Sequence, residues 1–260
     1  MKTARHSRHV GSKWRKNEAL LGSRKLRTYL PETRKFNRTN LELMLSKYKM
    51  VYVKPINGSF GRGVMRVDIK PSSGTRSYQY QLEKKTRVFT TIDDLYTSIQ
   101  KHKLTSNYLV QQGIHLLKYK KRRFDLRVMV QRSPEKVWKS TGHIGRLGHP
   151  KKIVTNYHSE GKPMAIELLL SPYIKDPMRM KSYIQTLRNL GEDIANHLKK
   201  SFPGIREIGV DIGVDHNMHP WIIEVNTSPD PYIFNQLKDK SMYRTVIRYS
   251  RLSGRFKRKK

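Results

Sequence analysis

The sequence predicts an α+β protein whose strands fall into two groups, because short apolar runs with strand periodicity alternate with segments of helical spacing. The chain has 260 residues, and 36% of them are hydrophobic, so it can form one large domain or two smaller ones with a real core. This composition excludes a disordered protein.

The first group of strands follows a polar, helical lead-in. Residues 17–26 and 40–48 are predicted helices on either side of a break at Pro31. The sequence Met-Val-Tyr-Val-Lys at residues 50–54 is typical of a short buried strand, and residues 64–69 alternate at period two after a glycine-rich turn. These two strands are therefore expected to form a hairpin.

Further strands are expected around residues 78–82 and 87–90, followed by a helix at residues 92–102 with its apolar side chains on one side. Residues 108–112 then form the next buried strand.

The second group of strands consists of two predicted pairs. Residues 124–130 and 137–143 turn at a Ser-Pro sequence, and residues 207–214 and 220–225 form a hairpin around a polar turn. Between the pairs, the longest predicted helix starts at Pro177 and follows a favourable aspartate N-cap.

The chain carries a large excess of positive charge. Its 54 Lys+Arg against 20 Asp+Glu give a formal net charge of +34, which favours an acidic substrate, peptide or polymer as partner. The absence of cysteine excludes disulfides, thiolate metal sites and a cysteine nucleophile. No apolar run is long enough to cross a bilayer and no signal-peptide pattern opens the chain, so we expect a cytoplasmic protein.

Two runs of basic residues stand out. Residues 118–123 are predicted to form a basic loop before a strand, and this loop either guides an acidic polymer or is simply a solvated surface. Residues 251–260 form a basic tail that would bind polyanions weakly.

A glycine-rich turn follows the lysine at the end of the first buried strand. Lys54 would be partly buried and needs an anion close by. Glycines permit the backbone to approach phosphate oxygens closely, so a nucleotide phosphate would satisfy this lysine. The residues of the turn that would contact phosphate are Gly58, Ser59, Gly61 and Gly63. A plain hairpin turn is the alternative.

Asp211 and Glu224 are expected to face each other, because a hairpin that pairs them has its midpoint between Asn217 and Met218, in a polar turn. Glu224 and Asn226 lie two residues apart on one strand and therefore share a face. Such oxygen ligands suit Mg²⁺. The alternative is that the two carboxylates point to solvent or pair with arginines.

Arg127 lies in the middle of a predicted strand, and Asp125 is expected on the opposite face. The arginine side chain offers a fork of donors that can clamp phosphoryl or acyl-phosphate oxygens as charge develops. A salt bridge to one of the carboxylates is the alternative.

Taken in order along the chain, these motifs resemble those of ATP-grasp ligases. The resemblance rests on Val53-Lys54-Pro55 with its glycine loop, Val110 to Ile114, Phe124 to Val128, Thr155-Asn156, Asp211, and Glu224-Val225-Asn226. Ser12-Lys13-Trp14, Leu30-Pro31-Glu32-Thr33 and Gln111-Gln112-Gly113-Ile114 further resemble the YheC/YheD branch of endospore coat-associated ATP-grasp proteins. The similarity extends over nearly the whole chain.

The resemblance implies an ATP-grasp fold in which two α+β subdomains grip ATP. The residues that match phosphate-binding lysines are Lys13 and Lys54. Those that match the hinge strand along adenine are Gln111, Gln112 and Ile114, where many relatives carry a glutamate in place of Gln112. The residues that match catalytic positions near the terminal phosphate are Arg127 and Asn156. Those that match ligands of usually two Mg²⁺ ions, with Mn²⁺ as an alternative, are Asp211, Glu224 and Asn226.

The same resemblance predicts how the chain is divided. An ATP-grasp domain at residues 13–250 would contain a nucleotide-lid subdomain at about 50–110 and a metal-binding subdomain at about 111–235, flanked by a basic lead at 1–12 and a basic tail at 251–260.

The pattern departs from that of most ATP-grasp ligases at the front of the chain. These enzymes carry a separate domain before the lysine that Lys13 matches, and only twelve residues precede Lys13 here. The acceptor site is therefore expected to be incomplete, or to be supplied by a protein partner or an oligomer.

The function that these expectations favour is an ATP- and Mg²⁺-dependent ligase, which activates a carboxylate as an acyl-phosphate for attack by an amine or thiol. The alternative is a basic spore-coat structural or binding protein that binds ATP or anionic polymers without catalysis. A nucleic-acid-binding protein is disfavoured, because no RNA- or DNA-binding module signature is present.

Overall fold

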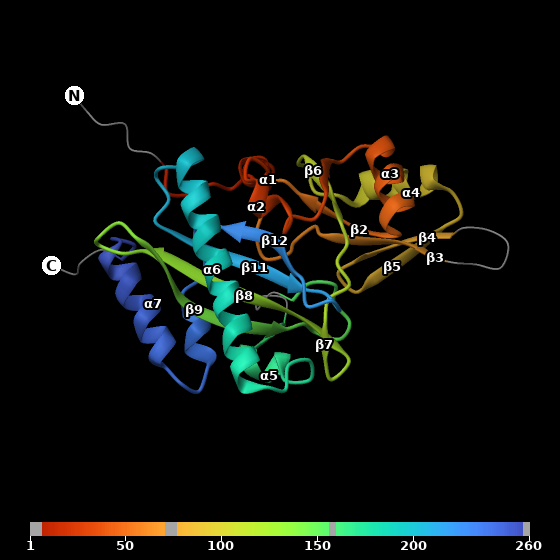
Figure 1. Ribbon diagram of the computed structural model, residues 1–260. Coiled ribbons are helices and arrows are strands. Elements are labelled where there is room, and N and C mark those ends of the chain that lie inside the picture. The colour runs from red at the N-terminus through yellow and green to blue at the C-terminus, as the bar shows by residue number, and fades with distance from the viewer. Residues whose placement is uncertain (1–6, 71–76, 156–159, 257–260) are drawn as a thin grey trace, which may run out of the picture. The chain divides into compact units, whose positions relative to one another are not determined.

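The computed structural model describes residues 7–70, 77–155 and 160–256, and it contains both of the expected sheets (Figure 1). The chain divides into two compact units. Unit 1 comprises Met1–Leu30, Leu116–Leu147 and Lys162–Lys260, and unit 2 comprises Pro31–His115 and Gly148–Gly161. The functional subdomains expected at 50–110 and 111–235 stay a prediction.

Unit 2 is built on a six-stranded antiparallel sheet. Its strands lie in the order β1 (Thr33–Lys35), β6 (Tyr108–Gln112), β2 (Met50–Pro55), β3 (Met65–Lys70), β4 (Ser77–Leu82) and β5 (Lys85–Phe89). The hairpin of β2 and β3 confirms the pairing expected on either side of the glycine-rich turn. The helices α3 (Arg38–Tyr48) and α4 (Ile92–His102) contribute Leu41, Leu95 and Ile99 to the apolar core of this unit.

Unit 1 contains a second antiparallel sheet. Its strands lie in the order β10 (Lys162–Met164), β9 (Trp138–Leu147), β8 (Arg122–Arg132), β11 (Glu207–Val214) and β12 (Pro220–Asn226), and β7 (Lys118–Tyr119) pairs with β8. The remaining elements of this unit are α1 (Lys13–Leu21), α2 (Arg24–Arg27), α5 (Ile166–Leu170), α6 (Pro177–Ser201), the 3₁₀ helix η2 (Tyr232–Gln236) and α7 (Ser241–Leu252).

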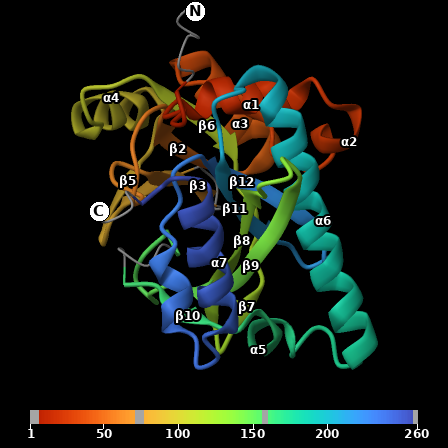
Figure 2. The ribbon, with the colours of Figure 1, turned by 90° about the vertical axis from the view of Figure 1, so that its left-hand side faces the viewer.

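Two helices cover opposite faces of this sheet. The helix α6 packs through Leu187 and Ile194 into the same cluster as Val128, whereas α7 packs through Val246 into the cluster that contains Met129. Residues 128 and 129 point to opposite faces because side chains alternate along a strand. Figure 2 shows α6 and α7 on the two sides of β8 and β9.

The start of α1 differs from the expectation of one helix at residues 17–26. Ser12 caps α1 by accepting a hydrogen bond from the Arg15 amide, and Ser23 caps the separate helix α2 in the same way from the Leu26 amide. Serine side chains satisfy the free amide groups at helix starts, so two caps produce two helices. Lys13 therefore lies in the first turn of α1.

No helix within the part of the chain that the structure describes is long and apolar enough to cross a membrane.

Candidate functional site

Four neighbouring strands of unit 1 place charged residues at matching register positions. Asp125 on β8 pairs with Arg146 on β9, and Arg127 on β8 pairs with Asp211 on β11. Asp211 in turn pairs with Glu224 on β12. Because directly paired residues point to the same face of a sheet, these side chains form one row. The expected pairing of Asp211 with Glu224 is confirmed.

Asp211 is held by two arginines at the centre of this row. The guanidinium of Arg127 donates from Nε to Asp211 Oδ1, and Arg146 Nη2 lies 3.0 Å from Asp211 Oδ2. Arg146 also donates from Nε to Asp125 Oδ1 at 2.8 Å. All four side chains are buried, so the sheet retains ionic groups only because each has an opposite charge beside it.

The structure corrects the expected position of Asp125. Asp125 and Arg127 were expected on opposite faces of the strand, but Arg146 contacts both Asp125 and the partner of Arg127, Asp211. Residues two apart on a strand share a face, which is the physical reason. The salt-bridge alternative for Arg127 is also realised, since its partner is Asp211.

Burial and neighbouring charges shift the pKa values of these groups in opposite directions. Burial by itself would raise the pKa of Asp211, but Arg127 and Arg146 lower it below its ordinary value. Burial opposes protonation of Arg146, yet Asp125 and Asp211 raise its pKa. Asp211 is therefore an anion throughout the physiological range.

Glu224 and Asn226 lie at the more open end of the row. Lys13 Nζ lies 3.4 Å from Glu224 Oε1, and the Glu224 side chain is 22% exposed. With its amide nitrogen facing Glu224, Asn226 donates to Glu224 Oε1 at 3.2 Å and accepts from Arg127 Nη2 at 3.2 Å. The structure thus brings Lys13, Arg127, Asp211, Glu224 and Asn226 together.

These residues offer a metal two carboxylates and an amide oxygen. Among the described residues, no group of three or more His, Cys, Asp or Glu side chains could hold a metal ion. The predicted set differs from such a group because its third member is Asn226. Oxygen donors are the type that Mg²⁺ prefers, and carboxylate oxygens bound by arginine retain further lone pairs, so the donor set fits this ion. Their role as metal ligands stays a prediction.

Unit 2 contains the predicted phosphate and adenine residues. Lys54 on β2 is 7% exposed, and its Nζ donates to Gln111 Oε1 at 2.6 Å. Gln111 donates in turn to Thr33 Oγ1 at 2.9 Å, so β2, β6 and β1 are linked through side chains. Gln111 holds the ammonium group of Lys54 at the end of the strand where the glycine turn begins.

The Gln112 side chain binds the backbone of the same unit. Its Oε1 accepts a hydrogen bond from the Glu32 backbone amide at 3.2 Å. The backbone amide of Gln112 in turn donates to the Glu32 carbonyl oxygen at 2.8 Å. Ile114 is buried two residues further on. In this structure Gln112 therefore positions the segment before β1 and the strand β6 against each other.

The turn after Lys54 has the backbone that glycine permits. Gly58, Gly61 and Gly63 have φ angles of 134°, 71° and 72°. Ser59 is exposed at the same turn. At Gly63 an added Cβ would meet Tyr108 Oη at 2.6 Å, so this position excludes a side chain as well. The loop can present amide groups to an anion, but its contact with phosphate stays a prediction.

Gly113 is essential for packing beside Gln112. An added Cβ would lie 1.9 Å from Met50 Sδ and 2.6 Å from the Met50 carbonyl oxygen. Since backbone cannot yield cheaply, Gly113→Ala is expected to destabilise unit 2 by about 2–3 kcal/mol. Hydrogen exchange at residues 108–112 should accelerate in the variant, and unchanged exchange there would contradict the packing described.

Because of Glu32, the stability of unit 2 is expected to depend on pH in the acid range. Lys47 chiefly, then Tyr48 and Arg34, lower the pKa of Glu32 to about 2, although burial opposes them. The unfolded value is about 4.3. Stabilisation by ionised Glu32 is thus complete above the unfolded value and is lost as the pH falls through the folded value.

Wild type is therefore expected to exceed Glu32→Gln in unit 2 stability by about 1 kcal/mol at pH 7, and this difference should shrink from about pH 4.5 towards pH 2. Hydrogen exchange of residues 108–112 at several pH values measures it. A difference that stays constant down to pH 2 would show that Glu32 does not carry it.

Among the described residues of unit 1, two buried cations, Arg146 and Lys16, were not among the predicted site residues. Arg146 binds Asp125 and Asp211 as described above. Lys16 in α1 is 5% exposed, and its pKa is lowered to about 8, mainly by burial, with Lys13 lowering it and Glu224 and Asp211 raising it. The spacing of Lys13 and Lys16, three residues apart on a helix, is the sequence signal that would have grouped them. Asn156 lies outside the described residues.

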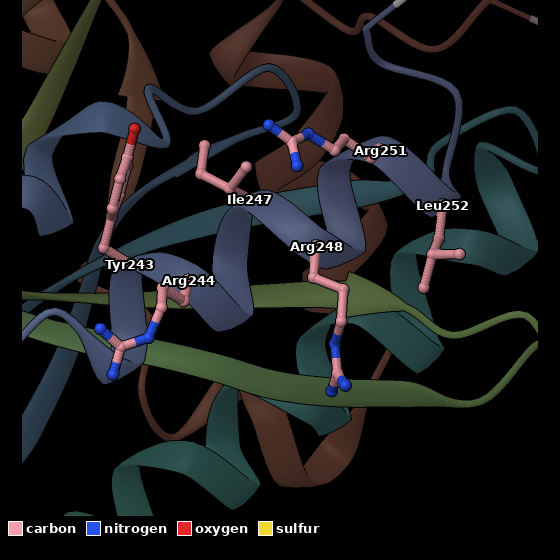
Figure 3. Close-up of a pocket in the computed structure, with 6 residues that line it drawn as sticks. All are labelled: Tyr243, Arg244, Ile247, Arg248, Arg251 and Leu252. Carbon is pink, nitrogen blue, oxygen red and sulfur yellow. The ribbon is translucent and has the colours of Figure 1, made fainter. Parts of the chain in front are cut away.

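A separate pocket lies over α7, and none of the predicted catalytic, cofactor-binding or metal-binding residues lines it (Figure 3). Three arginines and three apolar or aromatic residues line it. They are Tyr243, Arg244, Ile247, Arg248, Arg251 and Leu252. Arg244, Arg248 and Arg251 are all exposed, so this helix presents positive charge to solvent.

The chain is similar in sequence to one known family of proteins. A family model described as YheC/D-like ATP-grasp matches residues 4–252. The endospore coat-associated protein YheD of Bacillus subtilis (strain 168) is 27% identical over 86% of this chain and 49% of its own length. YheC of the same organism is 22% identical over 88% of this chain and 62% of its own length. The chain thus spans about half to three fifths of these relatives.

Solved structures share the fold. The N5-carboxyaminoimidazole synthase of Aspergillus clavatus in complex with ADP and 5-aminoimidazole ribonucleotide has a TM-score of 0.53 and 11% identity, over 95% of this chain and 52% of that one. A carboxyaminoimidazole ribonucleotide synthase of that organism, complexed with ATP, has a TM-score of 0.52 and the same identity and coverage.

Proposed function

Because the chain belongs to the YheC/D-like ATP-grasp family, we propose that it is an ATP- and Mg²⁺-dependent ligase that joins a carboxylate to an amine or thiol. The related Aspergillus structures contain ATP or ADP, which supports a nucleotide as the common ligand. The charged row of unit 1 and the lysine and glycine turn of unit 2 are the residues that would act on this nucleotide.

The single observation that carries the proposal is the register of β8, β11 and β12. It puts Arg127, Asp211 and Glu224 at directly paired positions, with Asn226 on the same face as Glu224. A catalyst of phosphoryl transfer needs cations and metal ligands together, because most of its effect is positioning and electrostatic stabilisation.

Each residue has a definite task in the proposed reaction. Lys54 and Lys13 would bind phosphate oxygens through their ammonium groups. The backbone amides of the glycine turn would bind phosphate oxygens as well, from Gly58, Ser59, Gly61 and Gly63. The end of β6 with Gln111 and Gln112, and Ile114 just after it, would lie along adenine. Asp211, Glu224 and Asn226 would hold Mg²⁺, which when bound neutralises phosphate charge. Arg127 would orient the terminal phosphoryl group, together with Asn156.

The proposed reaction needs no nucleophile from the protein. A substrate carboxylate oxygen attacks the γ-phosphorus and the bond to ADP breaks, which leaves an acyl-phosphate. The amine or thiol then attacks the acyl carbon, phosphate departs, and the attacking group loses its proton to solvent. Arg127 stabilises the charge that develops on the phosphoryl oxygens in the first step.

An ADP-release assay with Mg²⁺ tests this function. Amino acids, peptides and acidic polymers are screened as carboxylates, in pairs with amines and thiols. We expect release of ADP that requires one particular pair and disappears when Mg²⁺ is chelated. ADP release that is equal with and without every carboxylate would contradict a ligase.

The large positive charge favours a second candidate, a coat-associated binding protein that adheres to an anionic polymer without catalysis. The curated relatives are named endospore coat-associated proteins, and the exposed arginines of α7 supply a surface of the required sign. Under this candidate, Arg248→Met with Arg251→Met would weaken adhesion to an acidic polymer, while Glu224→Gln would leave adhesion unchanged. The ligase proposal predicts the reverse dependence for ADP release.

A cytoplasmic or coat-associated location and a partner that completes the acceptor site are parts of the same proposal. The chain spans only 49% of YheD and 62% of YheC, so an additional domain, a partner protein or an oligomer can supply the surfaces that select the carboxylate and the acceptor.

A further inference from the structure

Lys16 is a buried cation of unit 1 to which no role has been assigned. It is 5% exposed, although lysine is almost never buried unless it is paired. Within residues 7–70, 77–155 and 160–256, its ammonium group makes no hydrogen bond or ion pair, and only longer-range charges act on it. A buried charge without a counter-ion is costly, so this position requires an explanation.

The charges around Lys16 do not cancel. Arg146 pairs with Asp125, and Arg127 pairs with Asp211. Among the carboxylates, Glu224 raises the pKa of Lys16 most, but Glu224 already has Lys13 at 3.4 Å. In the described part of the chain, the four cations of this cluster outnumber its three carboxylates, so one positive charge has no counter-charge among them. The cations are Arg146, Arg127, Lys13 and Lys16, and the carboxylates are Asp125, Asp211 and Glu224.

The N-terminus of α1 adds to this positive field. Lys13 and Lys16 are three residues apart, so they lie on one face of the helix, and the first turn of a helix carries partial positive charge. The exposed fraction of the Glu224 side chain, 22%, leaves solvent access beside them.

We propose that Lys16, with Lys13, forms an oxyanion site on unit 1 that takes a carboxylate or phosphate group when a divalent cation binds Glu224 and Asp211. The cation would take up the charge of Glu224 that now lies beside Lys13. Both lysines would then lack a counter-charge, which an incoming oxyanion would supply. Binding of the oxyanion and the metal is therefore mutually favourable. This inference rests on the proposed function for the metal but concerns a residue which that function leaves unused.

The test measures binding rather than turnover. Inorganic phosphate and acetate are titrated calorimetrically into the full chain, each with and without Mg²⁺. We expect Mg²⁺ to strengthen the binding of one of them, and Lys16→Met to weaken that binding about ten- to hundredfold, whereas Lys16→Arg retains most of it. Preference for phosphate identifies a nucleotide phosphate as the natural group, and preference for acetate identifies the acyl substrate.

Arg15→Met is the matched control, because it removes the same charge from the exposed side of the same helix. It should leave oxyanion binding within twofold of wild type. Lys16→Met should fold at least as stably as wild type, since it removes a buried unpaired charge, so a loss of binding cannot be attributed to unfolding.

The outcomes separate this inference from the proposed function. If Lys16→Met and wild type bind both oxyanions equally with Mg²⁺ present, the oxyanion site is wrong even where Mg-ATP binds normally. If wild type shows Lys16-dependent oxyanion binding but no binding of Mg-ATP, the site is supported and the nucleotide function fails.

Discussion

Glu224→Gln is expected to lower the rate of ADP release by about 10²–10³-fold. The substitution keeps the size of the side chain but removes the charge that would hold Mg²⁺ and balance Lys13. Because Glu224 is the more exposed of the two paired carboxylates, the free energy of unfolding should change by less than about 1 kcal/mol. Steady-state ADP release at saturating ATP, measured beside a thermal unfolding curve, checks both statements.

Glu18→Gln provides the control for charge. Glu18 is an exposed carboxylate of α1 in the same unit, so its substitution removes one negative charge away from the row. It should leave ADP release unchanged. Activity of Glu224→Gln within threefold of wild type would remove Glu224 from the metal site.

Arg146→Met is expected to produce the largest loss of stability. The side chain is 4% exposed and binds both Asp125 and Asp211, so its removal leaves a buried carboxylate without a partner. Breaking a buried ion pair in this way costs about 3–5 kcal/mol. All three tryptophans, Trp14, Trp138 and Trp221, lie in unit 1, so urea denaturation followed by tryptophan fluorescence measures the unfolding of this unit.

Two further variants make the Arg146 result specific. Arg248→Met removes an exposed arginine of the same unit and should cost less than about 0.5 kcal/mol. The double variant Arg146→Met with Asp125→Leu removes both charges of one pair and should be more stable than Arg146→Met alone. Equal stability of Arg146→Met and wild type would show that the arginine does not support the row.

The fold class and the family were both predicted correctly from the sequence. Local periodicity indicated the strands and helices, and the order of the motifs along the chain carried the resemblance to the family. The hairpin of residues 207–214 and 220–226 could be placed because its polar turn lies midway between Asp211 and Glu224. Strand alternation also gave Glu224 and Asn226 one face. Such relations depend on neighbours in sequence, which a pattern reveals.

Contacts between distant strands could not be predicted in the same way. Arg146 reaches Asp211 because β8 lies between β9 and β11, and the strand order is not written in any local pattern. Misassigning the face of Asp125 concealed this link. The three-residue strand β1 was also missed, because it is too short for a periodic signal. The helix α7 was missed as well, since only its last two residues fall within the predicted basic tail at 251–260 and no element was predicted for the others.

Calorimetric titration of Mg-ATP into the purified chain tests the proposed function most directly, because that proposal assigns Lys54 and the carboxylates of β11 and β12 to the same nucleotide. We predict saturable binding at one site that requires Mg²⁺ and is weakened at least tenfold by either Lys54→Met or Glu224→Gln. Absence of binding heat with Mg-ATP, or binding that neither substitution changes, would contradict it.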